Sequence, residues 1–180
     1  MRLSRYCRPE AAFGWEWRVT ISAEGEHRQR GGSRRRSVAR LAAVQALYQI
    51  EANAEVDPQS VVHEFIRHRF GQEMDGDCLG DADPILFADI VCGVSSDHER
   101  LDAEISAALS EDWPLPRLDS VLRAILRAGA YELLHRRDIP PRVSLSEYTA
   151  IAYAFFTGKE PGLANGVLNH LAHMSRDGDL

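Results

Sequence analysis

The sequence has few of the residues from which disulfide frameworks, metal sites and membrane segments are built. Its three cysteines, Cys7, Cys78 and Cys92, are widely and irregularly spaced. This spacing offers neither a disulfide framework nor a CxxC metal pair, and it indicates reduced thiols. No apolar run approaches the roughly 18 residues of a membrane span, and the basic N-terminus lacks the apolar stretch of a signal peptide. The sequence therefore predicts a cytoplasmic protein with no membrane segment.

Motifs of catalytic and cofactor sites are also missing. There is no P-loop, no GxGxxG and no GxSxG. His170 and His173 share a helix face but have no third metal ligand beside them. Glu132, Asp138 and Glu147 fall near predicted helix ends without a histidine partner, which favours caps and ion pairs over acid–base catalysis. We therefore predict a protein that is not an enzyme and that holds no metal and no cofactor.

Charge is unevenly divided along the chain. Residues 1–36 hold nine arginines against four glutamates, a balance of +5. The remainder holds twelve basic against twenty-three acidic residues, a balance of −11, which gives the net charge of −6. A basic segment attached to an acidic body indicates a local site for a polyanion.

Apolar residues recur at helical spacing from residue 34 onward. Val38, Leu41, Ala42, Gln45 and Tyr48 form one stripe of the first predicted helix. Aspartate followed by proline, or aspartate alone, marks three later helix starts, and Ser96 with Glu99 fits a capping box near a restart. Seven helices are expected, at about 34–53, 58–70, 84–95, 96–112, 119–137, 144–156 and 160–175.

The pattern predicts an all-α fold, because no convincing pair of strands is found. The segment WEWRVTIS (15–22) alternates weakly, like a strand with no neighbour. We expect residues 1–33 to be a disordered basic N-terminal extension, added by an early start codon or present as a true tail. Residues 34–176 are expected to form the helical domain, and residues 177–180 a C-terminal tail.

Arginines gather at the predicted start of the first helix. Arg34, Arg35 and Arg36 are followed one turn later by Arg40. Guanidinium groups bind phosphate oxygens in a forked geometry or stack on bases, and the N–H groups of a first helical turn also attract anions. The helix dipole disfavours arginine there unless an outside anion compensates. RNA or DNA binding and a merely solvated basic end both remain open from this pattern alone.

Five blocks of the sequence, taken in order, resemble the NusB family. They are RRRSVARLAAVQALYQ (34–49), LFADIVCGV (86–94), LRAILRAGAYELLHRRDIP (122–140), PRVSLSEYTAIAYAFF (141–156) and LANGVLNHLA (163–172). The resemblance implies two packed helical subdomains and a transcription antitermination factor. It also implies partners: boxA-type leader RNA of ribosomal RNA operons, the ribosomal protein NusE and the RNA polymerase antitermination complex. A homodimer is expected where the partner is absent.

The resemblance also implies an RNA-binding set, carried over from the arginine-rich start, the AVQALY block and the NGVL block. This set is Arg34, Arg35, Arg36, Arg40, Gln45, Tyr48 and Asn165. The chain departs from the family pattern in two places: Ser146-Glu147 replaces Asn-Glu, and Gly162-Leu163 replaces Lys-Phe. The second departure removes a cation and an aromatic ring beside Asn165.

Two alternatives share the predicted fold. NusB-like domains also precede the catalytic domain of ribosomal RNA cytosine methyltransferases, but no methyl-donor fold is expected in this chain. The other alternative is an RNA-binding or protein-interaction module without an antitermination role. A steep loss of RNA affinity with salt would separate phosphate binding from a purely structural role.

Overall fold

The computed structural model describes residues 3–4, 20–21, 29–53, 55–70 and 82–175. Several parts of the sequence lie outside these residues. They are Cys7, Cys78, most of the predicted N-terminal extension, the predicted C-terminal tail, and residues 71–81 of the acidic stretch. The described part contains seven α-helices and one short 3-10 turn, η1 (Leu115–Arg117). The helices are α1 (Gln29–Ala52), α2 (Pro58–His68), α3 (Pro84–Ser96), α4 (His98–Ala108), α5 (Ser120–His135), α6 (Pro141–Phe155) and α7 (Glu160–Ser175).

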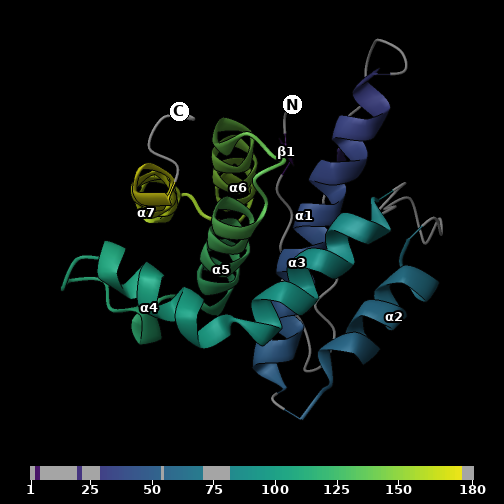
Figure 1. The fold of residues 1–180 in the computed structure, drawn as a ribbon, viewed down its shortest axis with the longest axis horizontal. Helices are drawn as coiled ribbons and strands as arrows, with labels where there is room; N and C mark the ends of the chain where they lie inside the picture. Colours follow the sequence, from purple (N-terminus) through teal and green to yellow (C-terminus); the bar gives the residue numbers. More distant parts are fainter. Residues whose placement is uncertain (1–2, 5–19, 22–28, 54, 71–81, 176–180) are drawn as a thin grey trace.

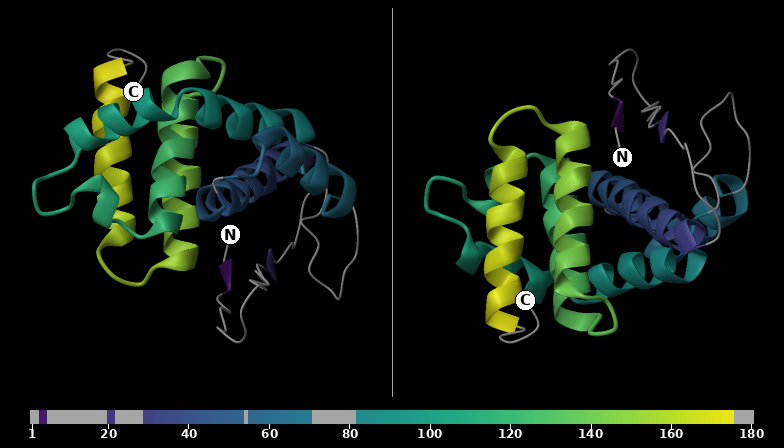
Figure 2. Two further views of the ribbon diagram at one scale, coloured as in Figure 1. Left: turned by 90° about the horizontal axis from the view of Figure 1, so that it is seen from below. Right: turned by 90° about the horizontal axis from the view of Figure 1, so that it is seen from above.

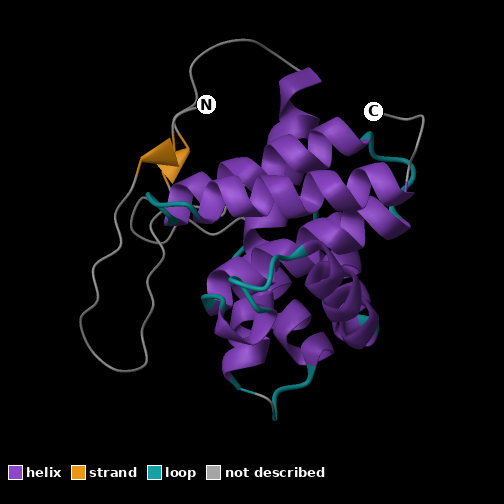
Figure 3. Cartoon of the chain, turned by 90° about the vertical axis from the view of Figure 1, so that its left-hand side faces the viewer, coloured by secondary structure: helices purple, strands orange, loops and turns teal. Residues whose placement is uncertain are grey.

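The helices form two groups that meet along α1 and α5 (Figure 1). Helices α2 and α3 pack on α1, while α4, α6 and α7 pack on α5. Helix α5 also contacts α1 and α3, so it joins the two groups, and the cartoon shows the helices gathered into one mass (Figure 3). The predicted all-α fold of seven helices in two packed subdomains is confirmed.

Three helix starts follow the predicted chemistry. The Asp57 carboxylate accepts a hydrogen bond from the backbone N–H of Ser60 at 3.0 Å. The Asp83 carboxylate accepts from Ile85 and the following residue at 3.1 and 3.2 Å, and Asp119 accepts from Val121 at 2.8 Å. Each aspartate satisfies N–H groups that have no partner within the helix, which fixes where the helix begins.

Three local predictions were wrong. The segment WEWRVTIS does have a strand neighbour, because β2 (Thr20–Ile21) pairs antiparallel with β1 (Leu3–Ser4). Ser96 does not cap α4: it is the last residue of α3, and its hydroxyl donates to the carbonyl of Gly93 at 3.0 Å. Helix α1 begins at Gln29, five residues before Arg34.

Helix α1 is held at its C-terminal end by an ionic cluster. The Glu51 carboxylate receives the guanidinium groups of Arg123 and Arg127 from α5. Arg127 also donates two hydrogen bonds to Asp102 of α4, at 2.6 and 2.7 Å. The hydrogen bonds that Arg127 donates to Asp102, opposed by burial and aided by Glu51, raise the pKa of Arg127. This cluster ties the end of α1 to both α4 and α5.

The Tyr131 ring of α5 packs directly on Gly93 of α3, so any side chain at Gly93 would overlap the ring. The ring is also held by stacking on His135 at 5.0 Å and by a 3.3 Å hydrogen bond to Asp89. Gly93→Ala is therefore expected to lower the free energy of unfolding by about 1–3 kcal/mol. Gly166→Ala is the matched control: its new methyl group meets nothing within 4 Å, so it should stabilise the exposed helix by about 0.5–1 kcal/mol. Urea denaturation of both variants measures the difference, and equal effects would contradict the packing argument.

Candidate nucleic-acid interface

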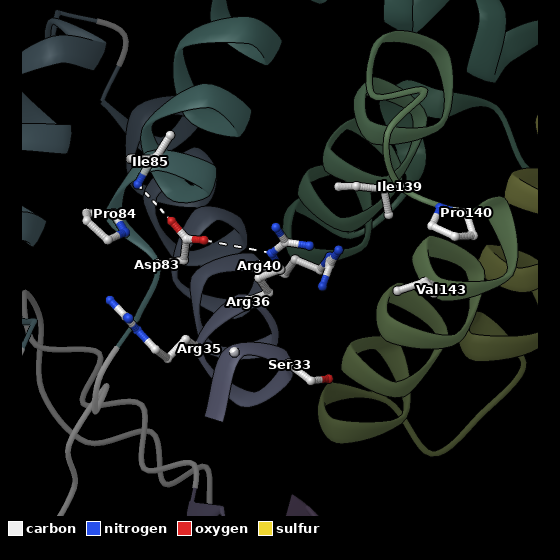
Figure 4. A pocket seen from close by; sticks show the side chains of 11 residues that line it. Ser33, Arg35, Arg36, Arg40, Asp83, Pro84, Ile85, Ile139, Pro140 and Val143 are labelled. Carbon is white, nitrogen blue, oxygen red and sulfur yellow. Dashed lines mark hydrogen bonds and ion pairs between the residues drawn. The ribbon is translucent and has the colours of Figure 1, made fainter. Parts of the chain in front are cut away.

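A cavity of about 650 Å³ lies where α1, α3 and α6 begin or nearly begin (Figure 4). The start of α3 forms one wall, and the α5–α6 connection with the first turn of α6 forms the opposite wall. Helix α1 supplies the basic groups between them. The lining residues are Gly32, Ser33, Arg35, Arg36, Arg40, Asp83, Pro84, Ile85, Ile139, Pro140 and Val143.

The arginines of α1 supply the positive charge at this cavity. Arg34, Arg35 and Arg36 are exposed, and two of them line the cavity. The sequence predicted that N–H groups of a first helical turn would help these arginines to attract an anion. That prediction was wrong, because α1 begins at Gln29 and the arginines lie beyond its first turn. Attraction of an anion to this stretch of α1 therefore comes from the guanidinium groups and not from the start of that helix.

Asp83 connects the basic surface to α3. One of its carboxylate oxygens caps α3, and the other lies 3.8 Å from Nε of Arg36. Because both groups are partly exposed, this ion pair adds little stability. It does restrict where the Arg36 side chain lies, at the rim between the two helix starts (Figure 4).

Arg40 occupies a different environment, with only 2% of its surface exposed. Its Nε lies 2.9 and 3.1 Å from the two Glu132 oxygens, and a second guanidinium nitrogen donates at 2.9 Å. The same carboxylate accepts from the Ser144 hydroxyl at 2.5 Å and from the Tyr148 hydroxyl at 3.4 Å. The predicted phosphate contact by Arg40 does not fit this geometry, because a buried carboxylate already occupies its guanidinium group.

The guanidinium group of Arg40 stays charged despite its burial. Burial lowers the pKa of Arg40, but the hydrogen bonds and the charge of Glu132 outweigh burial and raise it overall. Burial and the neighbouring Glu132 charge raise the pKa of Tyr148 well above its usual value, so its hydroxyl remains a donor. The network joins α1 to α5 and α6 directly behind the cavity.

Two further predicted contacts do not lie on an open surface. Gln45 is 7% exposed, and Tyr48 is half-buried against the core. Both belong to the stripe of α1 that packs on its neighbours, together with Val38 and Leu41. The helical period of the sequence already placed them in that stripe, so the signal for burial was available. The buried Gln45 offers little surface to a base, while Tyr48 keeps part of its surface exposed, and its base contact stays a prediction.

Asn165 is exposed, but it lies away from the cavity. It belongs to α7, and its carboxamide oxygen accepts a hydrogen bond from the Thr149 hydroxyl of α6 at 3.3 Å. Figure 2 shows α6 between α1 and α7. The structure therefore brings together the arginines at residues 34–36, and it places Asn165 on a separate surface beyond α6.

Sequence reasoning missed the residues that form the cavity walls. Ile85 is 79% exposed on one wall, and Val143 is 42% exposed on the other. Asp83 was predicted only as a helix cap. The Asp-Pro pairs marked the ends of these helices, but the meeting of α1, α3 and α6 is a long-range property that no local pattern contains.

No cluster of three or more potential metal ligands occurs among the residues that the structure describes. Within the same residues, no helix is long and apolar enough to cross a membrane. The buried acidic residue Glu132 faces an arginine, a serine and a tyrosine. This set suits the neutralisation of an internal cation better than the coordination of a metal ion.

Comparison with known proteins gives one consistent result. Residues 37–173 match the sequence model described as the NusB family. Transcription antitermination protein NusB of Brucella ovis is 55% identical over 142 residues, covering 79% of this chain and 82% of the relative. The protein of the same name from Nitrobacter hamburgensis is 49% identical over 145 residues, covering 81% and 90%.

Solved structures have the same fold. The structure of T. maritima NusB matches with a TM-score of 0.63 and 29% identity, covering 76% of this chain and 89% of that one. A crystal structure of the antitermination factors NusB and NusE in complex with double-stranded RNA matches with a TM-score of 0.59 and 22% identity. That match covers 77% of this chain and 96% of the solved one. Because the identity of this second match is only 22%, it supports the fold alone.

Proposed function

Because the chain belongs to the NusB family, we propose that it is a transcription antitermination factor. It binds boxA-type leader RNA of ribosomal RNA operons together with NusE and helps RNA polymerase resist termination. The observation that carries the proposal is the exposed surface formed by Arg34, Arg35 and Arg36 beside an open cavity. Guanidinium groups on a rigid helix suit the phosphates of a single RNA strand.

The charge of the chain fits a basic protein partner. Beyond residue 36 the sequence carries a balance of −11, because twelve basic residues face twenty-three acidic ones. Such a body repels a second nucleic acid and attracts a basic ribosomal protein. NusE is the partner that the family implies, and the solved relative in complex with RNA holds a protein of that name. In its absence we propose a homodimer.

We propose binding without catalysis, in the cytoplasm, by a domain spanning residues 34–176. The three acidic residues near helix ends have structural partners: Glu132 and Glu147 pair with Arg40, and Asp138 pairs with Arg136. The hydrogen bond from Arg136 lowers the pKa of Asp138 to about 2, so this carboxyl stays ionised at neutral pH and suits an ion pair. In this proposal the protein acts by holding RNA and partner together.

The deciding experiment is an RNA titration with and without NusE. Fluorescence anisotropy with boxA-type and scrambled RNA should show tighter binding of the boxA-type RNA when NusE is present, because each protein adds contacts to one strand. A transcription assay across a terminator should show readthrough that depends on this chain. RNA affinity that is the same with and without NusE would contradict the cooperative assembly.

Asn165 is proposed to read sequence rather than to bind phosphate. Its carboxamide oxygen is taken by Thr149 at 3.3 Å, and the exposed amide remains available to an unstacked base. Asn165→Ala is expected to reduce the preference for boxA-type over scrambled RNA by about five- to tenfold, the scale of one lost base contact. Anisotropy with both RNAs measures it, and thermal melting is the control. A loss of melting temperature without a change of preference would assign Asn165 to the fold.

A further inference from the structure

Large aliphatic side chains stand exposed on opposite walls of the arginine-lined cavity. Ile85, at the start of α3, is 79% exposed, and Val143, in the first turn of α6, is 42% exposed (Figure 4). Pro84 and Pro140 lie beside them on the same two walls. The cavity therefore combines apolar walls with a cationic side, a pairing that neither a solvated basic end nor ordinary core packing explains.

The exposure of Ile85 is unfavourable in the free protein. Leaving a large aliphatic side chain in water forgoes roughly 1.5–3 kcal/mol that burial would provide. Single exposed aliphatics are common on protein surfaces, but here two face one cavity whose volume of about 650 Å³ lies in the range of ligand pockets. An occupant that covers both walls would recover this apolar contact.

The charges of the lining select the class of occupant. Arg35 and Arg36 line the cavity, Arg34 is exposed beside them, and Asp83 is the one carboxylate among the lining residues. The buried Arg40 is already paired with Glu132, so among the lining residues two exposed arginines stand against one carboxylate. The occupant should therefore carry a negative group beside a flat apolar surface. A nucleotide has both, with a phosphate at one end and a base with two apolar faces at the other.

We infer that the cavity holds one unstacked nucleotide of the bound RNA, with its phosphate at Arg35 and Arg36 and its base between Ile85 and Val143. The inference rests on the proposed RNA-binding function and adds a position at which one base leaves the stack. Single-stranded RNA is commonly recognised by splaying bases out, and apolar side chains can enclose an extruded base. Ile85 and Val143 both stand in the first turns of helices, so the space between the two walls is formed before RNA binds.

The test combines a wall variant with abasic RNA. Ile85→Ala should weaken boxA-type RNA binding about five- to tenfold, consistent with the loss of one partly buried aliphatic contact, and should leave the salt slope unchanged because no charge is lost. Replacing each nucleotide in turn by an abasic one should reveal a single position at which Ile85→Ala has no further effect. At that position the effects of Ile85→Ala and of the abasic substitution are not additive, which identifies the base that lies between Ile85 and Val143.

Ile66→Ala is the matched control, because Ile66 is 38% exposed on α2 and does not line the cavity. It should leave RNA affinity unchanged. If the unmodified protein binds no boxA-type RNA, the proposed function fails. If it binds, but Ile85→Ala equals Ile66→Ala or weakens every abasic RNA equally, only the inference is overturned. Weakened NusE binding with unchanged RNA affinity would also overturn it, by assigning the cavity to a protein contact.

Discussion

Glu132→Ala is expected to lower the free energy of unfolding by about 3–5 kcal/mol, the range found when one partner of a buried ion pair is removed. Glu132 is fully buried and Arg40 is 2% exposed, so the arginine that remains would keep only the more distant Glu147, at 3.8 Å, as an ionic partner. Ser144 would also lose the acceptor of its 2.5 Å hydrogen bond. Urea denaturation at neutral pH measures the change.

A double variant distinguishes the charge from the packing. Replacing both partners, as Arg40→Met with Glu132→Leu, removes the unpaired charge and keeps most of the volume. Buried pairs replaced in this way are often neutral in stability or better, so most of the loss in Glu132→Ala should be recovered. An equal loss in the single and double variants would mean that shape, and not charge, makes Glu132 necessary.

The helices of this chain were predictable because their signals are local. Asp57, Asp83 and Asp119 each satisfy backbone N–H groups two or three residues away, so the sequence carries the whole cause of the helix start. The start of α1 was not predictable in this way. Its first residues include Gly31 and Gly32, which disfavour a helix, and the structure nevertheless begins it at Gln29.

The candidate site was less predictable because its parts come from distant segments. The arginine run gave the basic surface, but the same run could not show that Arg40 turns inward to a glutamate 92 residues away. Its burial depends on α5 and α6 packing against α1. The cavity walls depend on the same packing, since Ile85 and Val143 come from segments with no common sequence pattern.

A family motif also does not say which side of a helix binds. Gln45 and Tyr48 lie in the AVQALY block, one of the blocks that resemble the family, yet both sit in the packed stripe of α1. Packing against the core accounts for the residue types at these two positions, so their place in the motif does not by itself indicate an RNA contact. The exposed arginines and Asn165 lie outside the packed core, so RNA binding remains the role proposed for them.

The combined variant Arg34→Ala, Arg35→Ala, Arg36→Ala is expected to weaken RNA binding by about 100-fold at moderate salt, if each side chain contributes roughly 1 kcal/mol through one phosphate contact. The three side chains are exposed on one stretch of α1, so their loss removes charge from one surface without disturbing the core. The slope of log affinity against log salt should fall by about 2, since each contact to a single strand contributes about 0.7. BoxA-type and scrambled RNA should lose affinity about equally, because phosphate contacts carry no sequence information.

The matched control removes the same charge elsewhere. Arg67, Arg100 and Arg117 are exposed on α2, α4 and η1, and none of them lines the cavity. Replacing these three by alanine changes the net charge by the same amount, but the salt slope should stay nearly constant. General attraction of RNA to any positive charge would instead make the two triple variants equal. Equal slopes and equal losses would therefore remove the arginine surface of α1 from the RNA site, while a difference confined to the α1 variant would place the strand along that helix.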